Sequence, residues 1–268
     1  MAEPQILRAK IAGFPALRTE GAADRPPVLF IHGAFAGDDP FINWMRILAL
    51  DGWRTFAAVR RNHLDIGPDA IARITMADYV ADTLRVVDAL GVPPVIVGHS
   101  LGGLIAQKIA ELGKCRAAVL ASPAPSGILT PQVVALPALL PMLPKILLGR
   151  PLLPSYGTVK SLILNRVPVS DRARIYEGLR TDSGRVYRQM MLGRFRVDSW
   201  KVRCPIMVVG GNDDRVVSKY LTQETAALYA ADLQLYDGHA HWLLEEPGWQ
   251  KIGADIAAWL RRTLRVAV

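Results

Sequence analysis

Cysteine is scarce in this chain, which has only Cys115 and Cys204 among its 268 residues. Two cysteines cannot supply the several cross-links on which small disulfide-stabilised scaffolds depend. A disulfide scaffold is therefore excluded, and we predict two free, buried thiols in a protein of a reducing compartment.

Long uninterrupted apolar runs are also missing. The most apolar segment, VVALPALLPMLP from Val133, is broken by Pro137, Pro141 and Pro144 and is too short to span a bilayer. The first residues, MAEPQILRAK, lack the apolar stretch that a secretory signal requires. We therefore expect no stable membrane insertion and a cytoplasmic location.

Basic residues are in excess, but they do not form runs. The chain has 32 Lys and Arg against 24 Asp and Glu, a formal charge of +8, and its longest basic clusters are the pairs Arg60-Arg61 and Arg261-Arg262. No aromatic residues are interleaved with them, as they would be in many nucleic-acid surfaces, so we expect no nucleic-acid partner. The sequence also has no metal-ligand cluster and no dinucleotide fingerprint, so neither a metal nor a cofactor is predicted. The oligomeric state is left open.

Apolar residues are plentiful, at 51%, which excludes a disordered chain. Short apolar stretches alternate with segments of helical periodicity. Strands are expected at 6–12 and 15–19, as an antiparallel pair, and at 28–32, 55–59, 95–97, 117–121, 205–210 and 233–236; helices are expected at 42–49, 75–90, 101–112, 219–230 and 249–260. This order predicts an α/β fold whose mostly parallel sheet is covered by helices on both faces.

The composition changes between residues 123 and 198, where prolines, basic residues and aliphatic runs replace the strand pattern. A loop of this length is improbable inside a compact domain, so we expect a helical insertion packed over one edge of the sheet. The chain then divides into a core, residues 1–122 and 199–268, and a helical cap, residues 123–198, over the active site.

A Gly-x-Ser-x-Gly sequence carries the strongest chemical signal. Gly98-His-Ser-Leu-Gly102 lies between an expected strand and an expected helix, with Ser100 at the corner. A nucleophile on so sharp a turn needs neighbours without side chains two residues before and after it. Ser100 is therefore the candidate nucleophile.

A serine hydroxyl needs a general base, and the base needs an acid to orient it. On a doubly wound sheet both follow the serine in sequence, in the order acid and then histidine. His241, on a turn before the last helix, is the candidate base, with His239 as the alternative. Asp214, just beyond the strand that ends in two glycines, is the candidate acid, with the adjacent Asp213 as the alternative.

Backbone donors must also stabilise the oxyanion that forms when serine attacks a carbonyl. The N–H of Leu101 follows the nucleophile at the start of a helix, and the N–H of Ala34 follows the sharp turn at Gly33. We predict these two as the oxyanion hole. Phe35 is expected to be a pocket wall rather than a donor. Leu140 of the aliphatic cap is a further candidate pocket residue, and so is Trp242.

These motifs together resemble the α/β-hydrolase superfamily, and in particular its serine esterases and lipases with a cap. The resemblance rests on Gly98–Gly103, the loop His32–Ala34, the run Gly211–Val217 and the pair His241-Trp242. It implies an eight-stranded, mostly parallel sheet with the cap inserted after the sixth strand. In the family's usual spacing the acid lies three residues after a glycine, which permits Asp214 or Asp213.

The sequence departs from the resemblance at one loop. Relatives often carry an arginine–glycine–histidine–glycine turn where this chain has Arg60-Arg61-Asn62-His63. That loop is usually structural, so the departure affects its local conformation.

The predicted reaction is hydrolysis of carboxylic esters of small to medium hydrophobic substrates through an acyl-enzyme on Ser100. A serine at this position argues against dehalogenases and epoxide hydrolases of similar sequence, which use aspartate. Several alternatives remain open: a C–C bond hydrolase, a thioesterase or lactonase, a hydroxynitrile lyase, and a non-catalytic ligand-binding homologue. The positive charge and the apolar, proline-rich segment also leave open binding to a lipid interface.

Overall fold

Short buried strands whose side chains alternate between two faces form the centre of the molecule. The computed structural model describes residues 3–64 and 66–265. The strands of the main sheet are β1 (Leu7–Ile11), β2 (Phe14–Arg18), β3 (Val28–Ile31), β4 (Thr55–Ala58), β5 (Val95–His99), β6 (Ala117–Ala121), β9 (Ile206–Gly211) and β10 (Asp232–Tyr236). Their order in the sheet is β1-β2-β4-β3-β5-β6-β9-β10, and only the β1–β2 and β2–β4 pairings are antiparallel. The predicted α/β class is therefore confirmed.

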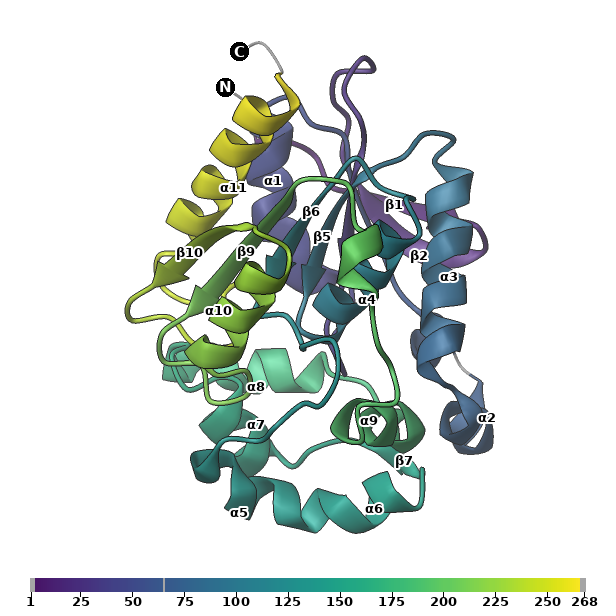
Figure 1. The fold of residues 1–268 in the computed structure, drawn as a ribbon, viewed down its shortest axis with the longest axis vertical. Helices are drawn as coiled ribbons and strands as arrows, with labels where there is room; N and C mark the ends of the chain where they lie inside the picture. The colour runs from purple at the N-terminus through teal and green to yellow at the C-terminus, as the bar shows by residue number, and fades with distance from the viewer. Residues whose placement is uncertain (1–2, 65, 266–268) are drawn as a thin grey trace.

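Helices cover both faces of this sheet because its central strands, β3, β5, β6 and β9, are buried on both sides. They are α1 (Ile42–Leu50), α3 (Met76–Ala89), α4 (Leu101–Glu111), α10 (Lys219–Leu228) and α11 (Trp249–Leu264). Helix α2 (Gly67–Arg73) packs instead against the segment between β6 and β9. In β3, Leu29 and Ile31 pack into the cluster that holds α3 and α4, whereas Val28 and Phe30 pack against α1 and α11. This period of two produces two core layers, which Figure 1 shows as helices on opposite sides of the strands.

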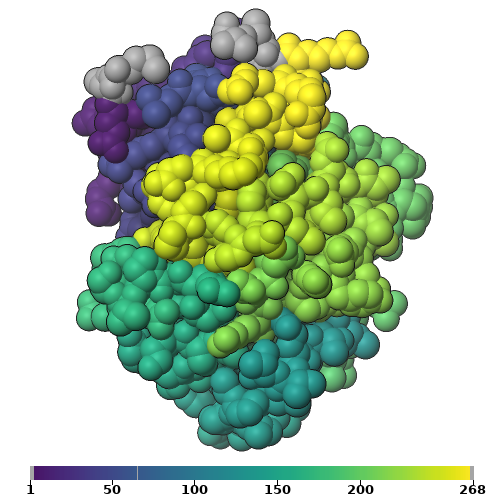
Figure 2. Space-filling model, turned by 90° about the vertical axis from the view of Figure 1, so that its left-hand side faces the viewer, coloured from purple at the N-terminus to yellow at the C-terminus, as the bar shows by residue number. Residues whose placement is uncertain are grey.

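Between β6 and β9 lies a group of short helices. It contains α5 (Leu136–Leu139), α6 (Leu143–Leu147), α7 (Tyr156–Leu162), α8 (Val169–Glu177) and α9 (Gly184–Met191). We call residues 123–198 the helical insertion. In Figure 1 it lies beyond one end of the sheet, opposite the chain termini, and its teal atoms form the lower end of the molecule in Figure 2. The expected helical content is present there, and its action as a cap remains a prediction.

The structure adds elements that the sequence patterns did not predict. The insertion contains a two-stranded antiparallel ladder, β7 (Pro151–Leu152) with β8 (Asp182–Ser183), where no strand was expected. Helix α2 is also additional, and single 3₁₀ turns form at 39–41, 61–63, 133–135, 140–142 and 199–201. Two-residue strands carry no periodicity, so only tertiary contact can define them.

The two cysteines are free and face each other, with their Sγ atoms 3.6 Å apart. Cys115 is buried as predicted, but Cys204 is only half-buried because it lies on the exposed approach to β9. Within the described residues, no helix combines the length and the apolar character that crossing a membrane requires.

Candidate active site

Ser100 occupies a strained turn between β5 and α4. Its backbone has φ 53° and ψ −117°, a left-handed conformation that costs a non-glycine residue free energy and persists only where neighbours enforce it. A Cβ atom at Gly98 would collide with the carbonyl of Gly102, and one at Gly102 with the carbonyl of Ile31. The glycines therefore allow the chain to pack tightly around the turn and leave the Ser100 side chain at the carboxyl end of the sheet.

The structure brings Ser100, His241 and Asp214 together. The Ser100 Oγ lies 3.0 Å from His241 Nε2, and His241 Nδ1 lies 2.9 Å from Asp214 Oδ2. Because an ionised carboxylate only accepts hydrogen bonds, Nδ1 carries the proton and Nε2 accepts from the serine hydroxyl. Both His241 and Asp214 are buried, which strengthens these interactions relative to water.

Asp214 is held in place through its other oxygen. Asp214 Oδ1 accepts the N–H groups of Val216, at 2.7 Å, and Val217, at 2.9 Å. The adjacent Asp213 instead forms an ion pair with Arg166, with an N–O distance of 2.6 Å. The carboxylate of Asp214 is therefore the one that contacts the imidazole.

His239, the alternative base, lies apart from Ser100. Its Nδ1 is 3.3 Å from the buried carboxylate of Glu246. The same carboxylate accepts the N–H groups of Ala240, at 2.7 Å, and Trp242, at 3.1 Å, on either side of His241. Glu246 thus braces the turn that carries the histidine.

The loop that follows β3 passes directly beside Ser100. A Cβ atom on Gly33 would lie 3.2 Å from the Ser100 Cβ and 2.9 Å from His99 Nδ1. Among the described residues, no backbone carbonyl or side chain accepts a hydrogen bond from the N–H of Ala34 or of Leu101. Both donors therefore remain free at the predicted oxyanion position.

Phe35 is fixed from the helical insertion. It has φ 63°, its N–H donates to Asp182 Oδ2 at 3.2 Å, and its carbonyl accepts the Arg180 N–H at 2.8 Å. The other oxygen of Asp182 accepts the hydroxyl of Tyr79. With its N–H occupied, Phe35 cannot serve as an oxyanion donor in this conformation.

A buried arginine, Arg60, also holds the loop that follows β3. Arg60 Nη2 donates to the Gly33 carbonyl at 3.0 Å, Nη1 donates to the His32 carbonyl, and the guanidinium lies 4.6 Å from the centre of the Tyr79 ring. The Arg60 N–H also donates to His32 Nε2 at 3.2 Å. The loop that departs from the family pattern therefore keeps an arginine bound to the loop that follows β3.

Buried histidines near the site are held neutral. Burial, helped by repulsion from His241, lowers the pKa of His99 to about 3. Burial and the nearby Arg60 likewise hold the pKa of His32 well below its usual value and lower that of His63 to about 3. Neutral imidazoles at these positions add no positive charge beside His241.

Two hollows flank the site. An apolar cavity of about 270 Å³ inside the insertion is lined by Phe35, Leu140, Tyr187 and Val216, among others. Phe35 follows Ala34, and Val216 follows Asp214 by two residues, so this cavity adjoins both functional loops. The predicted pocket residues Phe35 and Leu140 are thus found together.

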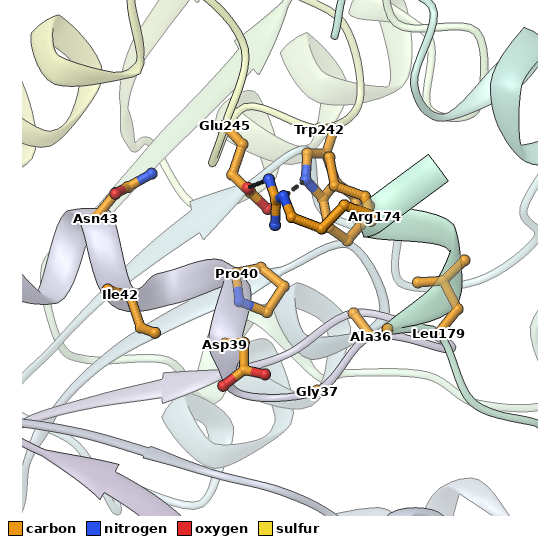
Figure 3. A pocket seen from close by; sticks show the side chains of 12 residues that line it. Ala36, Gly37, Asp39, Pro40, Ile42, Asn43, Arg174, Leu179, Trp242 and Glu245 are labelled. Carbon is orange, nitrogen blue, oxygen red and sulfur yellow. Dashed lines mark hydrogen bonds and ion pairs between the residues drawn. The ribbon is translucent and has the colours of Figure 1, made fainter. Parts of the chain in front are cut away.

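Trp242, the third predicted pocket residue, lines a different hollow. This cleft of about 570 Å³ lies between α8 and the first turn of α1. In Figure 3 the indole points toward Glu245, which accepts its Nε1–H at 3.2 Å and also pairs with Arg174.

Across residues 3–64 and 66–265, no three or more His, Cys, Asp and Glu side chains are arranged to hold a metal ion.

Comparison with known families agrees with this geometry. The sequence model described as the alpha/beta hydrolase family matches residues 28–249, most of the chain. The chain belongs to the alpha/beta hydrolase family. The match extends from β3 to the first residue of α11, so it includes every candidate catalytic residue of this alpha/beta hydrolase.

Solved structures share the fold of this alpha/beta hydrolase at low sequence identity. It is similar to a monoacylglycerol lipase of Paleococcus ferrophilus, with 19% identity, a TM-score of 0.71 and coverage of 97% of this chain and 99% of that one. A soluble variant of monoglyceride lipase from Saccharomyces cerevisiae gives 17% identity, a TM-score of 0.74 and coverage of 98% and 96%. The thioesterase domain from the curacin biosynthetic pathway gives 18% identity, a TM-score of 0.64 and coverage of 97% of this chain and 99% of that one. At these identities the likeness establishes the fold.

Sequence reasoning missed three residues that position this alpha/beta hydrolase's site: Arg60, Asp182 and Glu246. A glutamate before Pro247 marks the His241 turn, but nothing in the sequence separates Glu246 from Glu245. Asp182 lies 147 residues from the Phe35 N–H that it binds, so no local pattern connects them.

Proposed function

We propose that this chain is a serine hydrolase that cleaves carboxylic esters through an acyl-enzyme. Ser100 is the nucleophile, His241 the general base, and Asp214 the acid that orients the imidazole. The observation that carries the proposal is the continuous hydrogen-bonded chain from Ser100 Oγ through His241 to Asp214, in a family of hydrolases.

The reaction proceeds in two halves. His241 Nε2 takes the hydroxyl proton as Ser100 Oγ attacks the ester carbonyl, and the N–H groups of Ala34 and Leu101 stabilise the oxyanion. The imidazolium then gives its proton to the departing alcohol, which leaves an acyl group on Ser100. His241 next removes a proton from water, and the hydroxide attacks the acyl carbonyl. The imidazolium then returns this proton to Ser100 Oγ as the Oγ–acyl bond breaks, which releases the carboxylic acid and free serine.

The substrate has an apolar acyl part of small to medium size. The support is the apolar cavity of about 270 Å³ whose walls include Phe35 and Val216, from the loops that carry the oxyanion donor and the acid. Apolar walls favour an acyl chain over a charged group because burying an unpaired charge is costly. Two of the similar structures are named as a monoacylglycerol lipase and a monoglyceride lipase, names that denote acyl esters, which agrees with the proposal.

A fluorophosphonate probe and a series of nitrophenyl esters of increasing acyl length test the proposal. We expect labelling at Ser100, and in Ser100→Ala a loss of both labelling and turnover on the order of 10⁶-fold. Ser122→Ala is the matched control, because the buried Ser122 hydroxyl has no hydrogen-bond partner among the described residues and no base to activate it. Undiminished turnover in Ser100→Ala would remove the covalent mechanism, and an unlabelled, inactive wild type would favour a ligand-binding role.

A further inference from the structure

Six large aliphatic side chains lie exposed on one short stretch of the helical insertion. Val133 is 83% exposed, Leu140 61% and Leu148 65%. We call this set the apolar tip; its members are Val133, Val134, Leu136, Leu140, Leu147 and Leu148. The stretch runs from the 3₁₀ turn at 133–135 through α5 and α6, which Figure 1 shows at the end of the molecule farthest from the termini. Soluble monomers rarely expose several large apolar side chains close together unless a partner binds there.

The same insertion carries nearly all of the chain's net charge. Residues 123–198 contain eleven Lys and Arg against four Asp and Glu, so +7 of the total +8 lies in this segment. Four of these cations stand close to the tip: Lys145 in α6, Arg150 just after it, and Arg185 and Arg188 in the adjacent α9. Arg188 donates to the Leu147 carbonyl at 2.6 Å. No carboxylate of the described residues forms an ion pair with any of the four, which we call the basic rim.

Two residues of the apolar tip also line the apolar cavity. Leu136 and Leu140 are exposed on one side and line the cavity on the other, and Leu139 and Leu143 line it beside them. Only one layer of short helices thus lies between the cavity and any surface on which the tip docks. Three prolines interrupt that layer.

We propose that the apolar tip and the basic rim form a docking surface for an anionic lipid bilayer. Aliphatic side chains enter the boundary between headgroups and acyl chains, and unpaired cations beside them attract lipid phosphates. A second copy of this chain is a poorer occupant, because two surfaces that each carry the four cations of the basic rim would repel each other. Docking would place the cavity wall against the acyl chains of the bilayer.

Vesicle co-sedimentation with the full-length protein tests this surface. We expect binding to vesicles of phosphatidylglycerol mixed with phosphatidylcholine, weaker binding to pure phosphatidylcholine, and a decline of binding as salt rises. Lys145→Glu with Arg150→Glu should weaken binding at least about thirtyfold, because each basic residue near an anionic surface contributes about 1 kcal/mol, a factor of about five. Arg8→Glu with Lys10→Glu makes the same charge change on β1 and should bind nearly as wild type does.

A second test variant and its matched control probe the apolar part of the surface. Leu147→Gln with Leu148→Gln should lose most of the vesicle binding, whereas Leu112→Gln with Leu228→Gln, both 48% exposed on the core, should not. None of these residues lies in the proposed catalytic machinery, so hydrolysis of a soluble short-chain ester should stay within about twofold and report correct folding. Vesicle binding needs no turnover, so an inactive protein would leave this test intact.

Two results would overturn the proposal. One is equal binding by the tip and core variants, or the absence of binding to anionic vesicles. The other is a dimer in sedimentation velocity that Leu147→Gln with Leu148→Gln converts to a monomer, which would make the tip a contact between copies of this chain.

Discussion

Asp214 divides its two carboxylate oxygens between two tasks. One oxygen contacts His241 Nδ1 at 2.9 Å, and the other accepts two backbone N–H groups of the turn that follows. These two hydrogen bonds from the turn therefore hold the carboxylate in the orientation that contacts the imidazole. Asp213 points elsewhere, to a partly exposed ion pair with Arg166.

The two aspartates should consequently differ sharply in mutants. Asp214→Asn should lower kcat about 10⁴-fold, because an amide nitrogen can donate to Nδ1 and favour the wrong imidazole tautomer. Asp213→Asn should change kcat less than a few-fold, since an exposed ion pair contributes little. Steady-state hydrolysis of a soluble nitrophenyl ester measures both. A larger loss of kcat in Asp213→Asn than in Asp214→Asn would show that Asp213 orients the imidazole.

Local sequence predicts the residues of the candidate site that lie at turns with strong backbone requirements. The glycines around Ser100 can be recognised because steric crowding leaves no alternative there. The choice between Asp213 and Asp214 stays open in the sequence, because it depends on which side chain the turn directs inward. Asp182 and Glu246 act through contacts that only the folded chain creates.

At the scale of elements, hydrogen bonds connect the helical insertion to the loop that follows β3. Asp182, in β8, and Arg180 hold the N–H and the carbonyl of Phe35, whose φ of 63° is unfavourable for an aromatic residue. Phe35 directly follows Ala34. The insertion therefore determines the direction in which the proposed Ala34 donor points.

Asp182→Asn should disturb this arrangement without removing any proposed catalytic group. An amide offers one oxygen acceptor in place of two, so either the Phe35 N–H or the Ser183 N–H, which donates to the other carboxylate oxygen, loses its acceptor. We expect kcat to fall about tenfold to a hundredfold with a smaller change in KM, because a loop displaced slightly misplaces the oxyanion donor. Glu177→Gln, an exposed change in the same insertion, is the control. An equal change in kcat for both variants would contradict this coupling.

Elements of regular period are the ones that the sequence predicts well. The strands β3, β5, β6 and β9 are buried throughout, and α3 ends at Ala89, two residues before Gly91, the glycine that the pattern indicated as its stop, which has φ 76°. Helix α2 begins at Gly67-Pro68, a pair that usually signals a turn, and it packs on β7 and β8 of the insertion. Its stability comes from that contact, which local propensity does not encode.

At the scale of the whole molecule, charge is divided unevenly between the two parts. Outside residues 123–198 the chain has 21 Lys and Arg against 20 Asp and Glu, so the core is nearly neutral. The basic pI of about 9.7 is therefore a property of the insertion. The net charge alone, read from composition, hides this division.

Buried histidines should make the whole fold sensitive to acid. His32, His63 and His99 have folded-state pKa values below the ordinary 6.5, to about 3 for His63 and His99. Unfolding exposes them, and below about pH 6.5 the unfolded chain binds protons that the folded chain does not. Their contribution to stability is therefore complete above pH 6.5 and is lost as pH falls toward 3.

One carboxyl group acts in the opposite sense. Burial and the neighbouring Asp39 raise the pKa of Asp38 to about 6, so between pH 6 and 4 the folded chain binds a proton there. Three protons taken up on unfolding and one released give a net of about two. The free energy of unfolding should then fall by about 3 kcal/mol per pH unit between pH 6 and 4, at 1.4 kcal/mol per proton.

Urea unfolding at pH 7, 6 and 5 measures this dependence. His63→Gln removes one titrating group, so its slope between pH 6 and 5 should be shallower than that of the wild type by about 1.4 kcal/mol per pH unit. Asp38→Asn should instead steepen the slope, because it removes the one group that opposes the histidines. Parallel curves for the wild type and both variants would place the proton uptake on other groups.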